Sequence, residues 1–142
     1  MRIWFNVAGM EENDLARVTV DAAFRVHSAT GPGLLESVYE VLLTHELRKH
    51  GLDVKRQVPI QIRYDGIVFN EGFRADIVLN DSLLIEVKSV QKLEPVHSKQ
   101  VLTYLRLSDR RLGLLINFGE ALIKNGIKRI VNGLPDEAVP DI

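Results

Sequence analysis

The stretch RADIVLNDSLLIEVKS, residues 74–89, combines the pattern of an apolar hairpin with charged side chains that are able to do chemistry. Asp76 precedes the turn signal ND, and Glu86 and Lys88 follow it in an E-x-K arrangement. Two carboxylates can hold a hard divalent cation. That cation, with an ammonium group beside it, can assist the hydrolysis of a phosphate ester. Because so short a motif also occurs by chance, its interpretation depends on where the side chains point.

The register of this hairpin determines which face of the sheet each side chain points to. A hairpin that buries its apolar side chains pairs Ile77 with Ile85, and a slip of one residue would expose them. The same register places Asp76 opposite Glu86, with Cβ atoms about 4.5 to 5.5 Å apart, and puts Lys88 on the same face as Glu86. Carboxylates this close repel each other unless a proton or a cation lies between them. The alternative is a solvated strand edge on which these residues are ordinary surface charges.

The composition is typical of one globular domain, because 46% of the 142 residues are hydrophobic and 26% are charged. We assign residues 10–134 to this domain, 1–9 to a flexible N-terminal extension upstream of a second candidate start at Met10, and 135–142 to a C-terminal tail. The net charge of −1 argues against binding nucleic acid by bulk charge. The sequence has no cysteine and no apolar run near the roughly 20 residues that span a bilayer. We therefore expect no thiolate metal site, no membrane insertion and a cytoplasmic location.

Hydrophobic periodicity predicts two helices, then a strand-rich centre, then a third helix and two further strands. Strands are expected over 54–64, 67–79, 82–90, 112–119 and 126–131, with turns at DG 65–66 and ND 80–81. The first helix is expected to start at a cap on Asn13 or Asp14 and to end in TGPG, residues 30–33. The second is expected from Pro32 to Gly51, and the third over 95–108.

The second expected helix contains GLLESVY, residues 33–39, which resembles the pattern of the GxxExxY proteins, a branch of the PD-(D/E)XK nuclease-like superfamily. The resemblance continues in order through GFRADIVLNDSLLIEVKSV, VHSKQVLTYLRL, RLGLLINFG and GIKRIVNGL, and covers nearly everything from Asp14 to Leu134. It implies an α/β fold with a restriction-endonuclease-like core, a central mixed β-sheet flanked by α-helices. Ala75 stands where the superfamily name has proline. The resemblance implies that the catalytic residues are Asp76, Glu86, Lys88, Glu36 and Gln100.

A divalent cation would complete this chemistry. Asp76, Glu86 and the backbone carbonyl of Val87 would bind Mg²⁺, for which Mn²⁺ can substitute. The cation would polarise the phosphate and lower the pKa of a bound water. Lys88 would orient or deprotonate that water, or stabilise the charge of the transition state.

Residues of the helices are expected to surround this centre. Glu36 would hold a second metal or a coordinated water, whereas Glu40 is expected to be a solvated helix residue. Gln100 and Tyr104, four residues apart on one helical face, would contact the substrate backbone. The alternative for Tyr39 and Tyr104 is a core position with a bonded hydroxyl group.

Positive charge gathers in the C-terminal part of the chain. Residues 97–130 contain seven lysines and arginines against two acidic residues. A basic surface beside an acidic pocket is what a nuclease requires, although a solvated charged face has the same composition. The residues expected to bind nucleic acid are Tyr104, Arg106, Arg110, Arg111, Lys124, Lys128 and Arg129.

We predict a metal-dependent nuclease that hydrolyses phosphodiester bonds, with DNA as the expected substrate. The alternative is a catalytically silent nuclease-like fold that serves as a DNA-binding or protein-interaction module, because fold does not imply activity. A role as a homodimer or within a larger complex is also open. The intact set of Asp76, Glu86 and Lys88 favours the enzyme.

Overall fold

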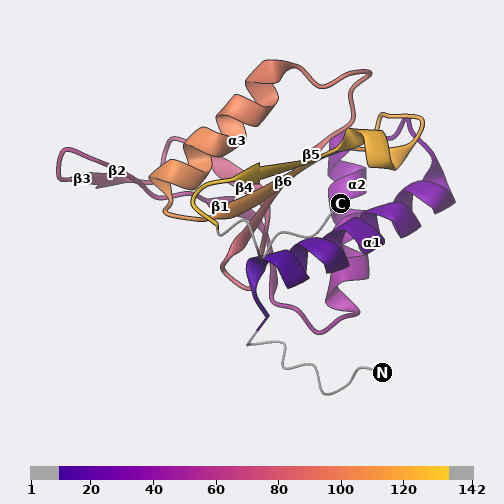
Figure 1. Cartoon of the computed structure of the whole chain (residues 1–142), viewed down its shortest axis with the longest axis horizontal. Helices are drawn as coiled ribbons and strands as arrows, with labels where there is room; N and C mark the ends of the chain where they lie inside the picture. The colour runs from indigo at the N-terminus through magenta and orange to yellow at the C-terminus, as the bar shows by residue number, and fades with distance from the viewer. Residues whose placement is uncertain (1–9, 135–142) are drawn as a thin grey trace.

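A five-stranded sheet forms the centre of the computed structural model, which describes residues 10–134 (Figure 1). The strand order is β1-β4-β5-β6-β7, in which β5 and β6 are parallel and the other neighbours antiparallel. The mixed sheet predicted from the sequence is therefore confirmed. The assignments made for 1–9 and 135–142 lie outside the described residues. The strands are β1 Val54–Pro59, β4 Arg74–Leu79, β5 Leu83–Lys88, β6 Leu112–Asn117 and β7 Ile127–Val131.

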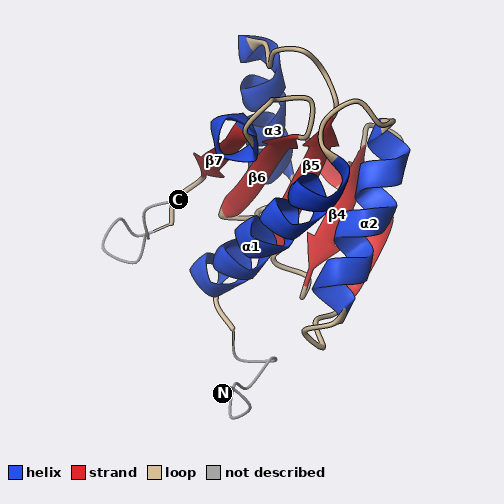
Figure 2. Ribbon diagram, turned by 90° about the vertical axis from the view of Figure 1, so that its right-hand side faces the viewer, coloured by secondary structure: helices blue, strands red, loops and turns tan. Residues whose placement is uncertain are grey.

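Helices cover both faces of the sheet. Helices α1 (Glu12–Thr30) and α2 (Glu36–Arg48) lie on one face, and α3 (Pro95–Leu107) lies on the other (Figure 2). Each face has its own apolar core, because strand side chains alternate: Ile77 and Ile85 pack toward α1 and α2, and Leu84 packs toward α3. Since β6 is buried along its whole length, its sequence is a continuous apolar run.

The starts of two helices differ from the sequence prediction. Helix α1 is capped by Glu11 rather than by Asn13 or Asp14, and Asp14 completes a capping box by accepting a hydrogen bond from the Glu11 N–H at 3.2 Å. Helix α2 begins at Glu36 rather than Pro32. The glycines of the TGPG turn have φ of 68° and 111°, so the chain turns there before it can become helical. No helix within residues 10–134 has the length and apolar character needed to cross a membrane.

The hairpin of β4 and β5 has the predicted register. Ile77 pairs with Ile85, and Leu79 with Leu83. The turn residues Asn80 and Asp81 have φ of 47° and 54°, the left-handed backbone that a tight two-residue hairpin turn requires.

A separate two-stranded arm follows β1. Strands β2 (Ile62–Tyr64) and β3 (Ile67–Phe69) pair only with each other in the described chain and extend away from the central sheet (Figure 1). The sequence predicted single strands over 54–64 and 67–79, and both predictions were wrong, because each stretch contributes one strand to the central sheet and one to the arm. Strand β1 ends at Pro59, which has no N–H to donate to a ladder, and Ile60 is then buried in the α3-side core.

Candidate active site

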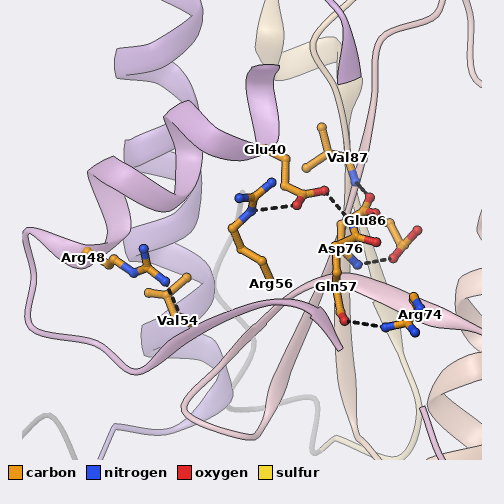
Figure 3. Close-up of polar contacts among 9 residues, drawn as sticks. All are labelled: Glu40, Arg48, Val54, Arg56, Gln57, Arg74, Asp76, Glu86 and Val87. Carbon is orange, nitrogen blue, oxygen red and sulfur yellow. Dashed lines mark hydrogen bonds and ion pairs between the residues drawn. The ribbon is translucent and has the colours of Figure 1, made fainter. Parts of the chain in front are cut away.

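Backbone pairing is interrupted at Asp76 on both sides. Strand β4 pairs with β1 on either side of this position, but Asp76 and Gln57 form no bridge, and the β4–β5 ladder begins only at Ile77. Carboxylates take over the bonding at this gap. The Asp76 N–H donates to Glu86 Oε1 at 3.0 Å, and the Val87 N–H donates to Asp76 Oδ2 at 2.8 Å (Figure 3). Each carboxyl group is thus held by the backbone of the opposite strand.

Both carboxyl groups are held in a setting that opposes their ionisation. Burial raises the pKa of Glu86 to about 8, and the charge of Asp76 contributes to the rise. Burial also raises the pKa of Asp76, with a further contribution from Glu40. The ammonium group of Lys88 acts against the rise at both groups, so it lies close to both carboxylates. The site is a partly desolvated acidic pair whose charge Lys88 partly compensates.

Metal-free protein is expected to lose stability as pH rises through the titration of Glu86. The folded-state pKa of about 8 lies above the ordinary value of 4.5, so between these values the folded chain holds a proton that the unfolded chain has released. The stabilising contribution is complete below pH 4.5 and is lost as pH rises through 8. Glu86→Gln keeps an oxygen acceptor for the Asp76 N–H and should flatten this dependence. Denaturant unfolding in chelator across the pH range measures it. Glu71→Gln, at an exposed residue between β3 and β4, is the control. Equal pH slopes for wild type and Glu86→Gln would contradict the expectation.

Glu40 is a third carboxylate near the pair, and the sequence prediction for it was wrong. Its side chain is only 6% exposed. It accepts hydrogen bonds from Arg56 Nε at 2.8 Å and from Gln57 Nε2 at 2.9 Å. The signal available in the sequence was its position one turn after Glu36, which puts both side chains on the helix face directed at the sheet.

Glu36 reaches the end of β5. Its Oε2 is 3.4 Å from the Ser89 nitrogen, which donates to it, next in the chain to Lys88. Tyr39 explains the spacing of the motif: its buried hydroxyl accepts from the Leu34 N–H and donates to the Gly31 carbonyl. Tyr39 therefore fastens the turn from which α2 begins, which confirms its interpretation as a core residue with a bonded hydroxyl.

Helix α3 brings polar groups to the other side of the pair. Gln100 and Tyr104 are hydrogen-bonded to each other, and Tyr104 stacks on Phe73. Burial raises the pKa of the Tyr104 hydroxyl, and the charge of Glu86 raises it further, so this residue lies near the acidic pair. The structure thus brings Gln100 and Tyr104 to the same site as the residues of β4 and β5.

The chain after Lys88 is anchored by residues that the sequence analysis missed. The Lys88 carbonyl accepts from the Phe118 N–H at 2.8 Å. The buried Asn117 side chain accepts from the Val90 N–H and donates to the Val90 carbonyl, both at 2.9 Å. A Cβ at Gly119 would lie 2.1 Å from that carbonyl oxygen, so only glycine fits. In the sequence, these three residues form the segment NFG at the end of RLGLLINFG, directly after the apolar run.

The donor set fits a hard divalent cation that keeps part of its water shell. Within residues 10–134, no group of three or more acidic, histidine or cysteine side chains is arranged to hold a metal ion. Asp76 and Glu86 nevertheless form a close pair whose negative charge Lys88 only partly compensates. Mg²⁺ is commonly bound through one or two carboxylates, with waters and substrate oxygens as the other ligands.

The basic residues do not form one free surface. Arg111 makes two 3.0 Å hydrogen bonds to Glu12, and Arg110 pairs with Asp81 at 3.1 Å. Arg129 donates to the Asn13 side chain. In the part of the chain that the structure describes, the exposed members of the predicted set that form no ion pair are Arg106, Lys124 and Lys128.

A mixed sheet flanked by helices, with Asp76 and the E-x-K sequence on adjacent strands, defines a restriction-endonuclease-like α/β domain. The chain belongs to the PD-(D/E)XK nuclease superfamily, whose family model matches residues 13–130. Solved structures with similarity to it include that of SSO0001, with 20% identity and a TM-score of 0.48 over 89% of this chain, which spans 61% of the length of that chain. Another is an alkaline exonuclease from Laribacter hongkongensis, with 19% identity and a TM-score of 0.39, over 87% of this chain and 82% of that one. Among curated proteins, none matches this chain.

Proposed function

We propose that the protein is a metal-dependent nuclease that hydrolyses phosphodiester bonds of DNA. The observation that carries this proposal is the desolvated pair of Asp76 and Glu86, with Lys88 beside it, in a chain of the PD-(D/E)XK nuclease superfamily. Where both groups are ionised, such a pair weakens the metal-free fold, and a bound cation would offset the repulsion.

Within the superfamily, we propose membership of the GxxExxY branch. The three named positions of that pattern each have a structural part here. Gly33 has the left-handed backbone of the turn, Glu36 reaches the end of β5, and Tyr39 fastens the turn to the helix. Together, these three residues hold the start of α2 beside β5, the strand that contains Glu86 and Lys88.

Mg²⁺ is the proposed cation, with Mn²⁺ as a substitute, and Asp76, Glu86 and the Val87 carbonyl would hold it. When bound, it would polarise the scissile phosphate and make water a stronger nucleophile at neutral pH. Lys88, whose charge acts on both carboxyl groups, would stabilise the negative charge that develops on the phosphate oxygens. Gln100 and Tyr104 would hold the substrate backbone from the α3 side.

The proposal is tested by incubating the pure protein with plasmid, single-stranded and branched DNA, in Mg²⁺, in Mn²⁺ and in chelator. Cleavage that requires the cation is the expected result. Binding without cleavage in any metal would favour the alternative of a silent DNA-binding module. Cleavage of RNA in parallel reactions would broaden the substrate class.

Neutralising the exposed basic residues is expected to weaken DNA binding without changing metal affinity. Among the described residues, Arg106, Lys124 and Lys128 have no carboxylate partner that would compete with a phosphate, in contrast to the paired arginines 110 and 111. The triple alanine variant should flatten the dependence of binding on salt by about one unit of logarithmic slope for each phosphate that is no longer neutralised. Fluorescence anisotropy at several salt concentrations measures this slope. Arg17 and Arg25 on α1 provide a control pair, and a slope equal to that of wild type would return these three residues to ordinary solvated surface.

A further inference from the structure

Gln57 has a backbone conformation that its place in a strand does not explain. Its φ is 52°, in the left-handed region that costs a residue with a Cβ about 1 kcal/mol or more. The other non-glycine residues with positive φ in the described chain are Asp65, Asn80, Asp81 and Asp109, and they lie in turns. Gln57 instead lies inside β1, where it interrupts the ladder opposite Asp76. An outlier of this kind calls for a local reason.

The side chain supplies that reason. Neighbouring residues of a regular strand point to opposite faces, yet Arg56 and Gln57 both donate to Glu40, at 2.8 and 2.9 Å. The left-handed turn of the backbone at Gln57 makes this convergence possible. The same Nε2 also donates to Asp76 Oδ1 at 3.3 Å, and the Gln57 carbonyl accepts from Arg74 at 3.2 Å (Figure 3). One neutral amide therefore spans two carboxylates.

Holding Glu40 does not by itself account for the strain. Arg56 already neutralises Glu40 through an ion pair. If Gln57 had the extended backbone of a regular strand, its amide would not reach Asp76. With it, Asp76 is fixed at both oxygens, because Oδ2 accepts from Val87 and Oδ1 from Gln57. Residues that hold a metal ligand in place typically contribute about 10- to 100-fold to metal affinity.

We propose that Gln57 is a positioning residue: its amide bridges Glu40 and Asp76 and sets the orientation in which Asp76 meets the cation and the substrate phosphate. This inference rests on the proposed function, since it assumes that Asp76 is a ligand. Gln57 itself does not touch the reacting atoms. Its contribution should appear as pre-organisation of Asp76, and not as stability of β1.

The first test is calorimetric titration of the whole protein with Mg²⁺ and with Mn²⁺. Gln57→Leu removes the amide and keeps the strain, whereas Gln57→Gly removes both. We expect both variants to bind metal about 10-fold more weakly or worse, and the glycine variant to be at least as stable as the leucine variant. If Gln57 served only the stability of β1, metal affinity would follow the stability of each variant. The glycine variant, which is free of backbone strain, would then bind metal like wild type, and this result would also overturn the inference. Gln61→Leu, an exposed glutamine of the next segment, is the control. Metal affinity within twofold of wild type in both variants would overturn the inference.

A second test requires no metal. The double-mutant cycle of Gln57→Leu and Asp76→Asn, followed by denaturant unfolding in chelator, reports whether the two side chains interact. The bond from the Gln57 amide to Glu40 is lost in either background, whereas its bond to the Asp76 carboxylate can be lost only while that carboxylate is present. We therefore expect effects that do not add. Additive effects would overturn the bridge. If wild type binds no metal while the cycle shows coupling, the metal-dependent function fails and the bridge from Gln57 to Asp76 stands.

Discussion

Lys88→Ala is expected to lower the rate of DNA cleavage by at least about a hundredfold while the protein stays folded. The charge of Lys88 acts on both Asp76 and Glu86, so in the proposed nuclease it would act on a phosphate held at the acidic pair. Its strand is fixed independently of its side chain, since the Lys88 carbonyl is bonded to the Phe118 N–H. Removing the ammonium group should therefore remove charge stabilisation without moving the backbone.

Single-turnover cleavage at saturating DNA measures this effect. It separates a loss of chemistry from a loss of binding, and only the rate of the bound complex should fall. Lys92→Ala, four residues later on an exposed loop, is the matched control and should cleave like wild type. Full activity in Lys88→Ala would exclude Lys88 from the reaction.

The sequence was sufficient to predict the hairpin that contains these residues, because local rules determine it. The turn residues Asn80 and Asp81 tolerate a left-handed backbone, and alternation of apolar side chains then leaves a single register that buries Ile77 and Ile85. The juxtaposition of Asp76 and Glu86 follows from that register alone. The order of the helices and of the strands of the central sheet was predictable for the same reason, since each of these elements has its own hydrophobic period. The separate arm of β2 and β3 was not predicted.

The surroundings of the pair could not be predicted in this way, because they depend on contacts between distant segments. Glu40 resembles any glutamate of a surface helix until α2 is placed over β1, where Arg56 and Gln57 reach it. Nothing in the local sequence indicates the left-handed backbone of Gln57. Glu36 was assigned to the site by resemblance, and its contact with the Ser89 nitrogen likewise joins segments that are distant in the sequence.

The basic residues show that a binding surface cannot be predicted from charge composition alone. Counting lysines and arginines over 97–130 gives a positive region, but the count ignores partners that the fold brings from elsewhere. Glu12 comes from the first turn of α1 to pair with Arg111, and the bonds to Arg111 lower the pKa of this carboxyl group. Asp81 comes from the β4–β5 turn to pair with Arg110. A prediction of a binding surface therefore needs the tertiary contacts as well as the charges.

Asp76→Asn is expected to stabilise the metal-free protein and to abolish most of the stabilisation by metal. At a pH above the Glu86 pKa of about 8, both carboxylates are charged and repel each other across the gap in the ladder. Asparagine removes one charge and keeps an oxygen that can accept from the Val87 N–H, but it loses the longer 3.3 Å bond from Gln57. Because relief of the repulsion should exceed the loss of that bond, the melting temperature in chelator should rise. A cation that binds only the folded wild type stabilises it by about 1.4 kcal/mol at tenfold excess over Kd, which corresponds to a melting shift of roughly 3 to 6 °C.

Four thermal melts test this expectation: wild type and Asp76→Asn, each in chelator and in millimolar Mg²⁺. The two effects must appear together, because both arise from the same charge. Asp21→Asn, an exposed residue of α1, serves as the control and should keep the wild-type shift on adding metal. A wild type without a metal-dependent shift, or a mutant that keeps the whole shift, would remove Asp76 from the ligand set. In that case the paired carboxylates would be a feature of the fold alone, and the silent nucleic-acid-binding module would become the better account of the protein.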